Sequence, residues 1–225
     1  MSHSTLPQRS DTGFEVVLFD VGGVLVHLSG IEVMVGWLGG DLTEEQLWRR
    51  WLQSQVVRRF ETGGSDAATF ARELAREFDL QIEPPRLLAA FEGWLTGPYP
   101  GALELIREIP QRYVRALLSN SNALHWPRIT GEMGLGALFA PEHRFVSHLT
   151  GRMKPDAEAF DHVIGELGCV PARVLFLDDN QLNVEAAEHA GLHAVRVRGP
   201  REARRALLER GILAVSARDR ALDPQ

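Results

Sequence analysis

Short apolar runs recur along the chain in an order typical of alternating strands and helices. The first, Val16–Phe19, is uninterrupted and rich in strand-forming residues, as expected for a parallel strand that is covered on both faces. Similar runs follow at Val114–Leu118, Val174–Leu177 and Ala194–Val197, and the segments between them have helical spacing. This alternation predicts an α/β protein built on a parallel sheet.

Caps, glycines and prolines mark the helices that connect these predicted strands. The predicted helices cover residues 101–109, 124–133, 156–167, 180–190 and 201–210. Gly168 and Gly191 directly follow two of them, which is typical of helix C-termini. Helices therefore separate the predicted strands, as parallel pairing requires.

The stretch from Ser29 to Pro98 interrupts this alternation, because it contains several helical blocks and no convincing strand. Thr43 and Gln46 predict a capping box that opens a helix through about Phe60. Two further helical blocks are predicted at residues 65–78 and 84–95. We therefore expect an inserted helical domain.

The length of the chain agrees with such an insertion. At about 150 residues per domain, 225 residues correspond to one domain that carries a substantial extra segment. The predicted division is an α/β core of residues 1–28 and 99–225, with a small α-helical domain at 29–98. A cluster of glycines and prolines at 97–101 is a plausible hinge between the two.

Aromatic residues form a stripe in the predicted insertion. Trp48, Trp51, Leu52 and Gln55 share one helix face at three- and four-residue spacing. The simplest interpretation is a packing stripe, and contact with a substrate is the alternative. Packing is likewise the favoured interpretation for Trp94, near the hinge.

Composition narrows the class of protein. Hydrophobic residues make up 44% and charged residues 24%, which excludes a disordered chain, and the net charge of -6 argues against nucleic acid as a partner. No uncharged stretch approaches the roughly 20 apolar residues that span a bilayer, and residues 1–13 lack an apolar signal-peptide core. A single cysteine, Cys169, cannot form an internal disulfide, so we expect a cytoplasmic protein.

Polar residues whose side chains could bind a ligand or take part in a reaction follow three of the predicted strands. Asp20 stands between the first strand and Gly22-Gly23, where glycines let the backbone approach a ligand. Ser119 and Asn120 end the second strand, and their hydroxyl and amide groups can hold anionic oxygens. Because ligands of open parallel sheets bind at the carboxyl ends of the strands, these residues are expected to converge.

Two further groups complete this set. Lys154 precedes Pro155 at a helix start, and Asp178 with Asp179 ends the third strand. Adjacent carboxylates repel each other unless they are solvated or bind a cation, and Mg²⁺ prefers such oxygen ligands. The order of Asp, Ser/Asn, Lys and paired Asp is improbable as coincidence.

With these motifs the sequence resembles the haloacid dehalogenase-like hydrolase superfamily. The four matching motifs are FDVGGVLV, LLSNSN, KP and FLDDN, and the resemblance covers nearly the whole chain. It implies a Rossmann-like parallel sheet core, with residues 29–98 as a helical cap. The string FETGGSDAATFA is similar to caps of the sugar-phosphatase and epoxide-hydrolase-phosphatase branch.

The resemblance implies a role for each motif. Asp20 would attack phosphorus and form an aspartyl-phosphate, and Lys154 would neutralise charge and orient Asp20. Ser119 and Asn120 would bind the phosphoryl group. These implied roles match what phosphoryl transfer requires, because the reaction depends mainly on positioning and charge neutralisation.

The resemblance also implies a magnesium site. Mg²⁺ would be held by Asp20, the backbone carbonyl of Gly22, and the pair Asp178 and Asp179, with Asp179 the favoured direct ligand of that pair. The expected activity is therefore Mg²⁺-dependent hydrolysis of a small phosphorylated metabolite, such as a sugar phosphate, by a monomer or homodimer.

Gly22 departs from the usual pattern of these phosphatases, which carry a second Asp at this position as general acid and base. The loss of such a group typically costs ~10² to 10⁴ in rate. Either another group supplies the proton, with Glu61 and His27 as candidates, or the leaving group needs none. The alternatives are a non-catalytic phosphometabolite-binding protein and a 2-haloacid dehalogenase, which donates no proton to halide.

Overall fold

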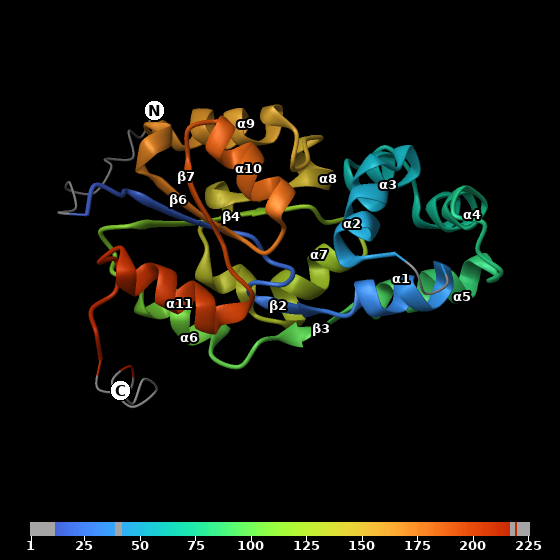
Figure 1. The fold of residues 1–225 in the computed structure, drawn as a ribbon, viewed down its shortest axis with the longest axis horizontal. Helices are drawn as coiled ribbons and strands as arrows, with labels where there is room; N and C mark the ends of the chain where they lie inside the picture. The colour runs from blue at the N-terminus through green and yellow to red at the C-terminus, as the bar shows by residue number, and fades with distance from the viewer. Residues whose placement is uncertain (1–11, 39–41, 217–218, 220–225) are drawn as a thin grey trace.

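The computed structural model describes residues 12–38, 42–216 and 219 (Figure 1), so most of residues 1–13 lie outside the described residues. Its main feature is a parallel five-stranded sheet with the strand order β5-β4-β1-β6-β7. The strands are β1 (Val16–Phe19), β4 (Val114–Ser119), β5 (Arg144–Val146), β6 (Val174–Asp178) and β7 (His193–Arg196). The predicted Rossmann-like α/β class is confirmed.

The central strand β1 is fully buried, because helices cover both faces of the sheet. Val17 and Phe19 face the layer of α6 (Ala102–Glu108) and α11 (Gly199–Glu209). Val16 and Leu18 face the opposite layer, formed by α9 (Ala157–Leu167) and α10 (Gln181–His189). Figure 1 shows these two helical layers above and below the sheet. The continuous apolar run is thus explained by burial on both faces.

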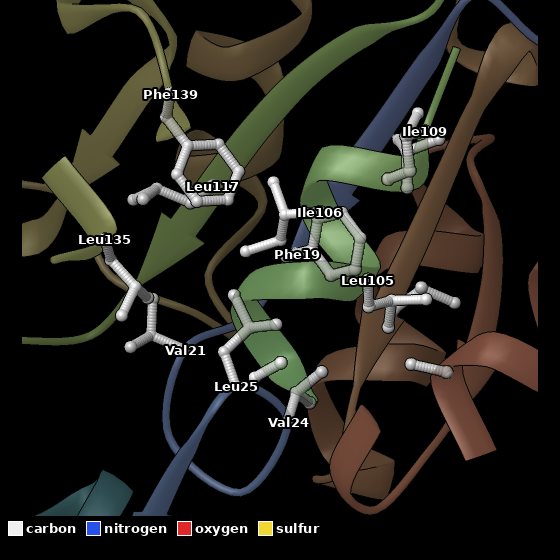
Figure 2. Close-up of a cluster of buried hydrophobic side chains, with 14 of the residues drawn as sticks. Phe19, Val21, Val24, Leu25, Leu105, Ile106, Ile109, Leu117, Leu135 and Phe139 are labelled. Atoms are coloured by element: carbon white, nitrogen blue, oxygen red, sulfur yellow. The ribbon is translucent and has the colours of Figure 1, made fainter. Parts of the chain in front are cut away.

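One of the two core layers is shown in Figure 2. Phe19 of β1 lies against Leu105 and Ile106 of α6, and Phe139 and Leu117 lie beside them. All five side chains are at most 2% exposed. This packing fixes β1, and with it the backbone that leads into Asp20.

The helical insertion lies beside the sheet (Figure 1). It has its own hydrophobic cluster. Its helices are α1 (Gly30–Leu38), α2 (Glu44–Gln53), α3 (Gln55–Glu61), α4 (Ala67–Glu77) and α5 (Pro84–Glu92). Aromatic rings dominate the cluster, as the stacked pair Phe60 and Phe70 illustrates, with ring centroids 4.2 Å apart. The exact limits of this domain at 28/29 and 98/99 stay predictions.

The insertion differs from the sequence prediction in two places. The single helix predicted through Phe60 is broken at Ser54, whose hydroxyl accepts a hydrogen bond from Val57 N at 3.1 Å and caps α3. The expectation of no strand was also wrong. Strand β3 (Leu95–Pro98) pairs antiparallel with β2 (Val26–Leu28), so a two-stranded ribbon joins the insertion to the core.

Smaller differences occur in the core. The helix predicted at 124–133 consists of α7 (His125–Pro127) followed by a π-helical turn at Arg128–Glu132. The edge strand β5, which the sequence analysis did not predict, is followed directly by α8 (Ser147–Thr150). Within the described residues, no helix has the length and apolar character needed to cross a membrane.

Candidate functional site

The carboxyl edge of the sheet brings three carboxylates and one ammonium group together. Asp20 follows β1, while Asp178 ends β6 and Asp179 comes next. Oxygen atoms of these three carboxylates lie within 4.8 Å of one another. Lys154 Nζ donates to Asp20 Oδ1 at 2.7 Å and to Asp178 Oδ2 at 2.6 Å. The sequence prediction that these residues converge is therefore met by the geometry.

The position of Lys154 is set by Asn120, across the sheet edge. Asn120 Oδ1 accepts from the Lys154 backbone N–H at 2.8 Å, and Asn120 Nδ2 donates to the Lys154 carbonyl oxygen at 2.8 Å. This reciprocal pair uses both polar atoms of the Asn120 side chain. Asn120 thus holds Lys154, and it also lines the cavity.

The two adjacent aspartates have different surroundings. Asp178 Oδ1 accepts from the Asn180 backbone at 2.8 Å, and both of its oxygens accept from Asn183 Nδ2 at 3.1 Å. Together with Lys154, these donors saturate the fully buried Asp178 side chain. Asp179 instead lines the cavity. Of the pair, Asp179 is the one placed to meet a ligand.

Burial and mutual repulsion shift the pKa values of these groups. Burial, reinforced by the Asp178 charge, raises the pKa of Asp20 to about 7 against the opposing effect of Lys154. Burial and the charges of Asp20 and Asp178 raise the pKa of Asp179 to about 8. For Lys154, burial opposes the charged form, but the two aspartates outweigh it and raise the pKa well above its ordinary value. Asp20 and Asp179 are therefore both harder to ionise than an ordinary carboxyl group.

The turn after β1 approaches these carboxylates closely. Gly23 has a left-handed φ of +72°, and a Cβ at this position would stand 2.2 Å from Asp179 Oδ2. A glycine is thus required both by the backbone conformation and by the contact. Gly22 lines the cavity and presents no side chain to it. This turn brings main-chain groups up to the carboxylate cluster.

Ser119 and the loop that follows it lie at the end of β4, the strand that pairs with β1. Ser119 is the last residue of β4 and is 3% exposed. The following loop is fixed by Ser147, whose hydroxyl accepts from Ser121 N and donates to Ser121 O, both at 2.9 Å. Ser119 therefore lines the cavity on a backbone that is held in place.

Core and insertion residues together line a cavity of about 90 Å³. From the insertion come Trp48, Trp51 and Leu52 of α2, with Phe91 and Trp94. The interpretation of this stripe as packing alone is incomplete. Trp51 does pack in the aromatic cluster, 5.0 Å from Trp94 between ring centroids, but both residues also form the wall of the cavity.

Two further ionisable residues that line the cavity, Glu61 and His125, are buried. Glu61 is 7% exposed, and its Oε2 atom has no hydrogen-bond partner. Burial raises the pKa of Glu61 to about 7, although Trp51, Lys154 and Arg58 act in the opposite direction.

His125, which sequence reasoning missed, is 6% exposed and stacks on Phe91 with ring centroids 4.6 Å apart. Burial lowers the pKa of His125 to about 4. His27, by contrast, is exposed, contacts Thr96 at 3.0 Å and does not line the cavity. No pattern in the sequence distinguishes His125 from the other histidines, because its burial is visible only in the structure.

Comparison with known proteins agrees with this fold. The sequence profile of the haloacid dehalogenase-like hydrolases matches residues 14–191. The parallel sheet defines an α/β protein, and an acidic cluster bridged by Lys154 lies at one edge of that sheet. The chain belongs to the haloacid dehalogenase-like hydrolase family.

Curated relatives include several phosphatases. The chain is 23% identical over 181 residues to a D-ribitol-5-phosphate phosphatase of Bacteroides thetaiotaomicron, which covers 78% of this chain and 87% of that protein. It is 27% identical over 191 residues to a phosphoglycolate phosphatase of Pseudomonas putida, with 80% and 68% covered.

Solved structures show the same fold. A haloacid dehalogenase family enzyme from Bacteroides thetaiotaomicron, in complex with magnesium and inorganic phosphate, matches with a TM-score of 0.62 and 23% identity over 82% of this chain and 94% of that chain. An L-2-haloacid dehalogenase from Xanthobacter autotrophicus matches with a TM-score of 0.58 and 24% identity over 93% and 88%. At these sequence identities, the structural similarity shows a shared fold and nothing further.

Proposed function

We propose that this protein is a Mg²⁺-dependent phosphatase that hydrolyses a small phosphorylated metabolite, such as a sugar phosphate. The observation that carries the proposal is the cluster of Asp20, Asp178 and Asp179 bridged by the buried Lys154, at the edge of a cavity. Names of the curated relatives support a phosphomonoester substrate.

The donor set fits a magnesium ion. The three carboxylates supply hard oxygen atoms within 4.8 Å of one another, and the glycine turn lets main-chain oxygen atoms approach them. A dication among these groups would relieve the repulsion that raises the pKa values of Asp20 and Asp179. We assign Asp20, Asp179 and the Gly22 carbonyl as its ligands, with Asp178 holding Lys154 and the loop.

In this proposal, bound Mg²⁺ neutralises charge on the phosphoryl group. Asp20 is the nucleophile that attacks phosphorus, and Lys154 holds the Asp20 carboxylate while balancing the charge that develops. Ser119 donates its hydroxyl to a phosphoryl oxygen. Asn120 positions Lys154 through the two hydrogen bonds to its backbone.

The aromatic wall supplied by the helical insertion would select the leaving group. Because the enclosed volume is only about 90 Å³, we infer a small leaving group. Trp48, Trp51 and Trp94 offer flat apolar faces of the kind on which sugar rings and short carbon chains pack. The insertion is thus proposed to act as a specificity cap.

The proposal is tested by measuring phosphate release from a panel of sugar phosphates, polyol phosphates and short-chain phosphoesters, with Mg²⁺ and with EDTA. We expect multiple turnovers on at least one member with Mg²⁺ and none with EDTA. Ligand-induced stabilisation without turnover would instead favour a non-catalytic binding protein. Metal-independent chloride release from 2-chloropropionate would favour a dehalogenase.

A further inference from the structure

A phosphatase of this design needs a proton donor for the leaving oxygen, and Gly22 cannot be that donor because it has no side chain. Among the described residues that line the cavity, the ionisable ones are Asp20, Glu61, His125, Lys154 and Asp179. Asp20 is assigned as nucleophile and Asp179 as metal ligand. Three groups are left to compare.

Two of these three groups are already committed to other partners. Lys154 Nζ donates to both Asp20 and Asp178. His125 Nε2 lies 2.8 Å from the Phe91 carbonyl oxygen, to which it donates, and His125 Nδ1 lies 3.3 Å from Asn122 Nδ2, from which it accepts. The ring of His125 is therefore neutral and has no proton to offer the cavity.

Glu61 differs from both, because a buried carboxyl oxygen has no partner. The residue is only 7% exposed, and its Oε2 atom is inaccessible to solvent and makes no hydrogen bond. An unpartnered buried oxygen is costly unless something pairs with it. Glu61 lines the cavity, where a substrate oxygen would be such a partner.

Residues just before and just after Glu61 in the sequence contact the core. One turn earlier in α3, Arg58 forms an ion pair with Asp156, two residues beyond Lys154. Two residues later, Gly63 has a φ of +80°, and a Cβ there would stand 2.7 Å from the His148 carbonyl oxygen. These contacts hold the end of α3 against the core segment that carries Lys154. Accordingly, the positive charge of Lys154 acts to lower the pKa of Glu61.

We propose that Glu61 is the general acid and base that Gly22 cannot supply. This inference rests on the proposed phosphatase function. In the first step, an oxygen of Asp20 bonds to phosphorus, the bond from phosphorus to the leaving oxygen breaks, and that oxygen takes the Glu61 proton to leave as an alcohol. In the second step, water attacks the aspartyl-phosphate, the Glu61 carboxylate takes its proton, and Asp20 is released with inorganic phosphate.

The environment of Glu61 suits both steps. Burial keeps a substantial fraction of Glu61 protonated near neutral pH, since its pKa is about 7. The groups that oppose this shift are the indole of Trp51 and the charges of Lys154 and Arg58. A group that titrates near the working pH can donate a proton in one step and accept one in the next.

The test compares Glu61→Gln with the wild type on two kinds of phosphomonoester, in the presence of Mg²⁺. The first is an alkyl ester from the substrate panel, whose alkoxide is a poor leaving group. The second is p-nitrophenyl phosphate, whose phenolate leaves without protonation. We expect Glu61→Gln to lower kcat/KM on the alkyl ester by ~10² or more and to change kcat/KM on the aryl ester only a few-fold.

The matched control is Glu92→Gln, because Glu92 is an exposed glutamate on α5 that does not line the cavity. It is expected to behave as wild type on both esters. Equal loss on both esters in Glu61→Gln, or no loss on the alkyl ester, overturns the role of Glu61. If the wild type hydrolyses neither ester, the proposed function itself fails, which is a distinct result.

A second measurement needs no variant and so does not depend on how Glu61→Gln folds. Across a series of esters, the wild-type kcat/KM should depend only weakly on the acidity of the leaving alcohol, because the departing oxygen is protonated by the enzyme. A steep dependence, with good activity on aryl esters alone, would show that no side chain donates this proton and would contradict the proposal.

Discussion

The unusual ionisation of Glu61 leads to a prediction about folding stability that is independent of activity. The pKa of Glu61 rises from an ordinary value of 4.5 to about 7 in the folded protein, chiefly through burial. The folded state therefore keeps a proton that the unfolded state has lost, and stability falls as the pH rises through this interval. At about 1.4 kcal/mol per pH unit, the interval corresponds to about 3 kcal/mol.

Glutamine has nearly the same shape and does not ionise, so Glu61→Gln should escape this loss. We expect the variant to resemble the wild type near pH 5 and to gain about 2 kcal/mol in unfolding free energy relative to it near pH 8. Urea unfolding of both proteins in EDTA measures the difference, in which the titrations of Asp20 and Asp179 cancel. The exposed Glu92→Gln control should show no such trend. A stability difference that is the same at both pH values would show that folding does not raise the pKa of Glu61.

Two further predictions concern the glycine turn and the helix break. Gly23→Ala should weaken Mg²⁺ binding ~10-fold or more in calorimetry, because its Cβ would stand 2.2 Å from Asp179 Oδ2 at a backbone φ of +72°; unchanged affinity would contradict the assigned ligand set. Ser54→Ala should lower the urea-unfolding free energy by about 1 to 2 kcal/mol, since its hydroxyl caps α3 at Val57 N and donates to Glu77 Oε2 at 2.9 Å; a loss near zero would argue against that cap.

The sequence predicted the features that depend on local pattern. The apolar run Val16–Phe19 coincides with β1, because a strand buried on both faces must be apolar throughout. Asp20, Lys154 and Asp178 could be brought together from sequence, since strand ends of a parallel sheet meet at one edge.

Other features depend on contacts that a sequence pattern does not contain. β3 includes Gly97 and Pro98, which disfavour strands, and it forms because β2 lies beside it. The break at Ser54 lies between two segments with good helical spacing, and the side-chain cap that makes it is visible only in three dimensions. The isolation of Glu61 Oε2 depends on the packing of several elements, which is why the sequence could name Glu61 only as one of two candidates.

The central claim is that Asp20 is the nucleophile of a Mg²⁺-dependent phosphatase. The most direct measurement is the inorganic phosphate released per molecule of protein, with Mg²⁺ and the best ester of the panel, by the wild type and by Asp20→Asn. We expect many equivalents from the wild type and none above background from Asp20→Asn. Equal release by both proteins, or no release by the wild type, would contradict it.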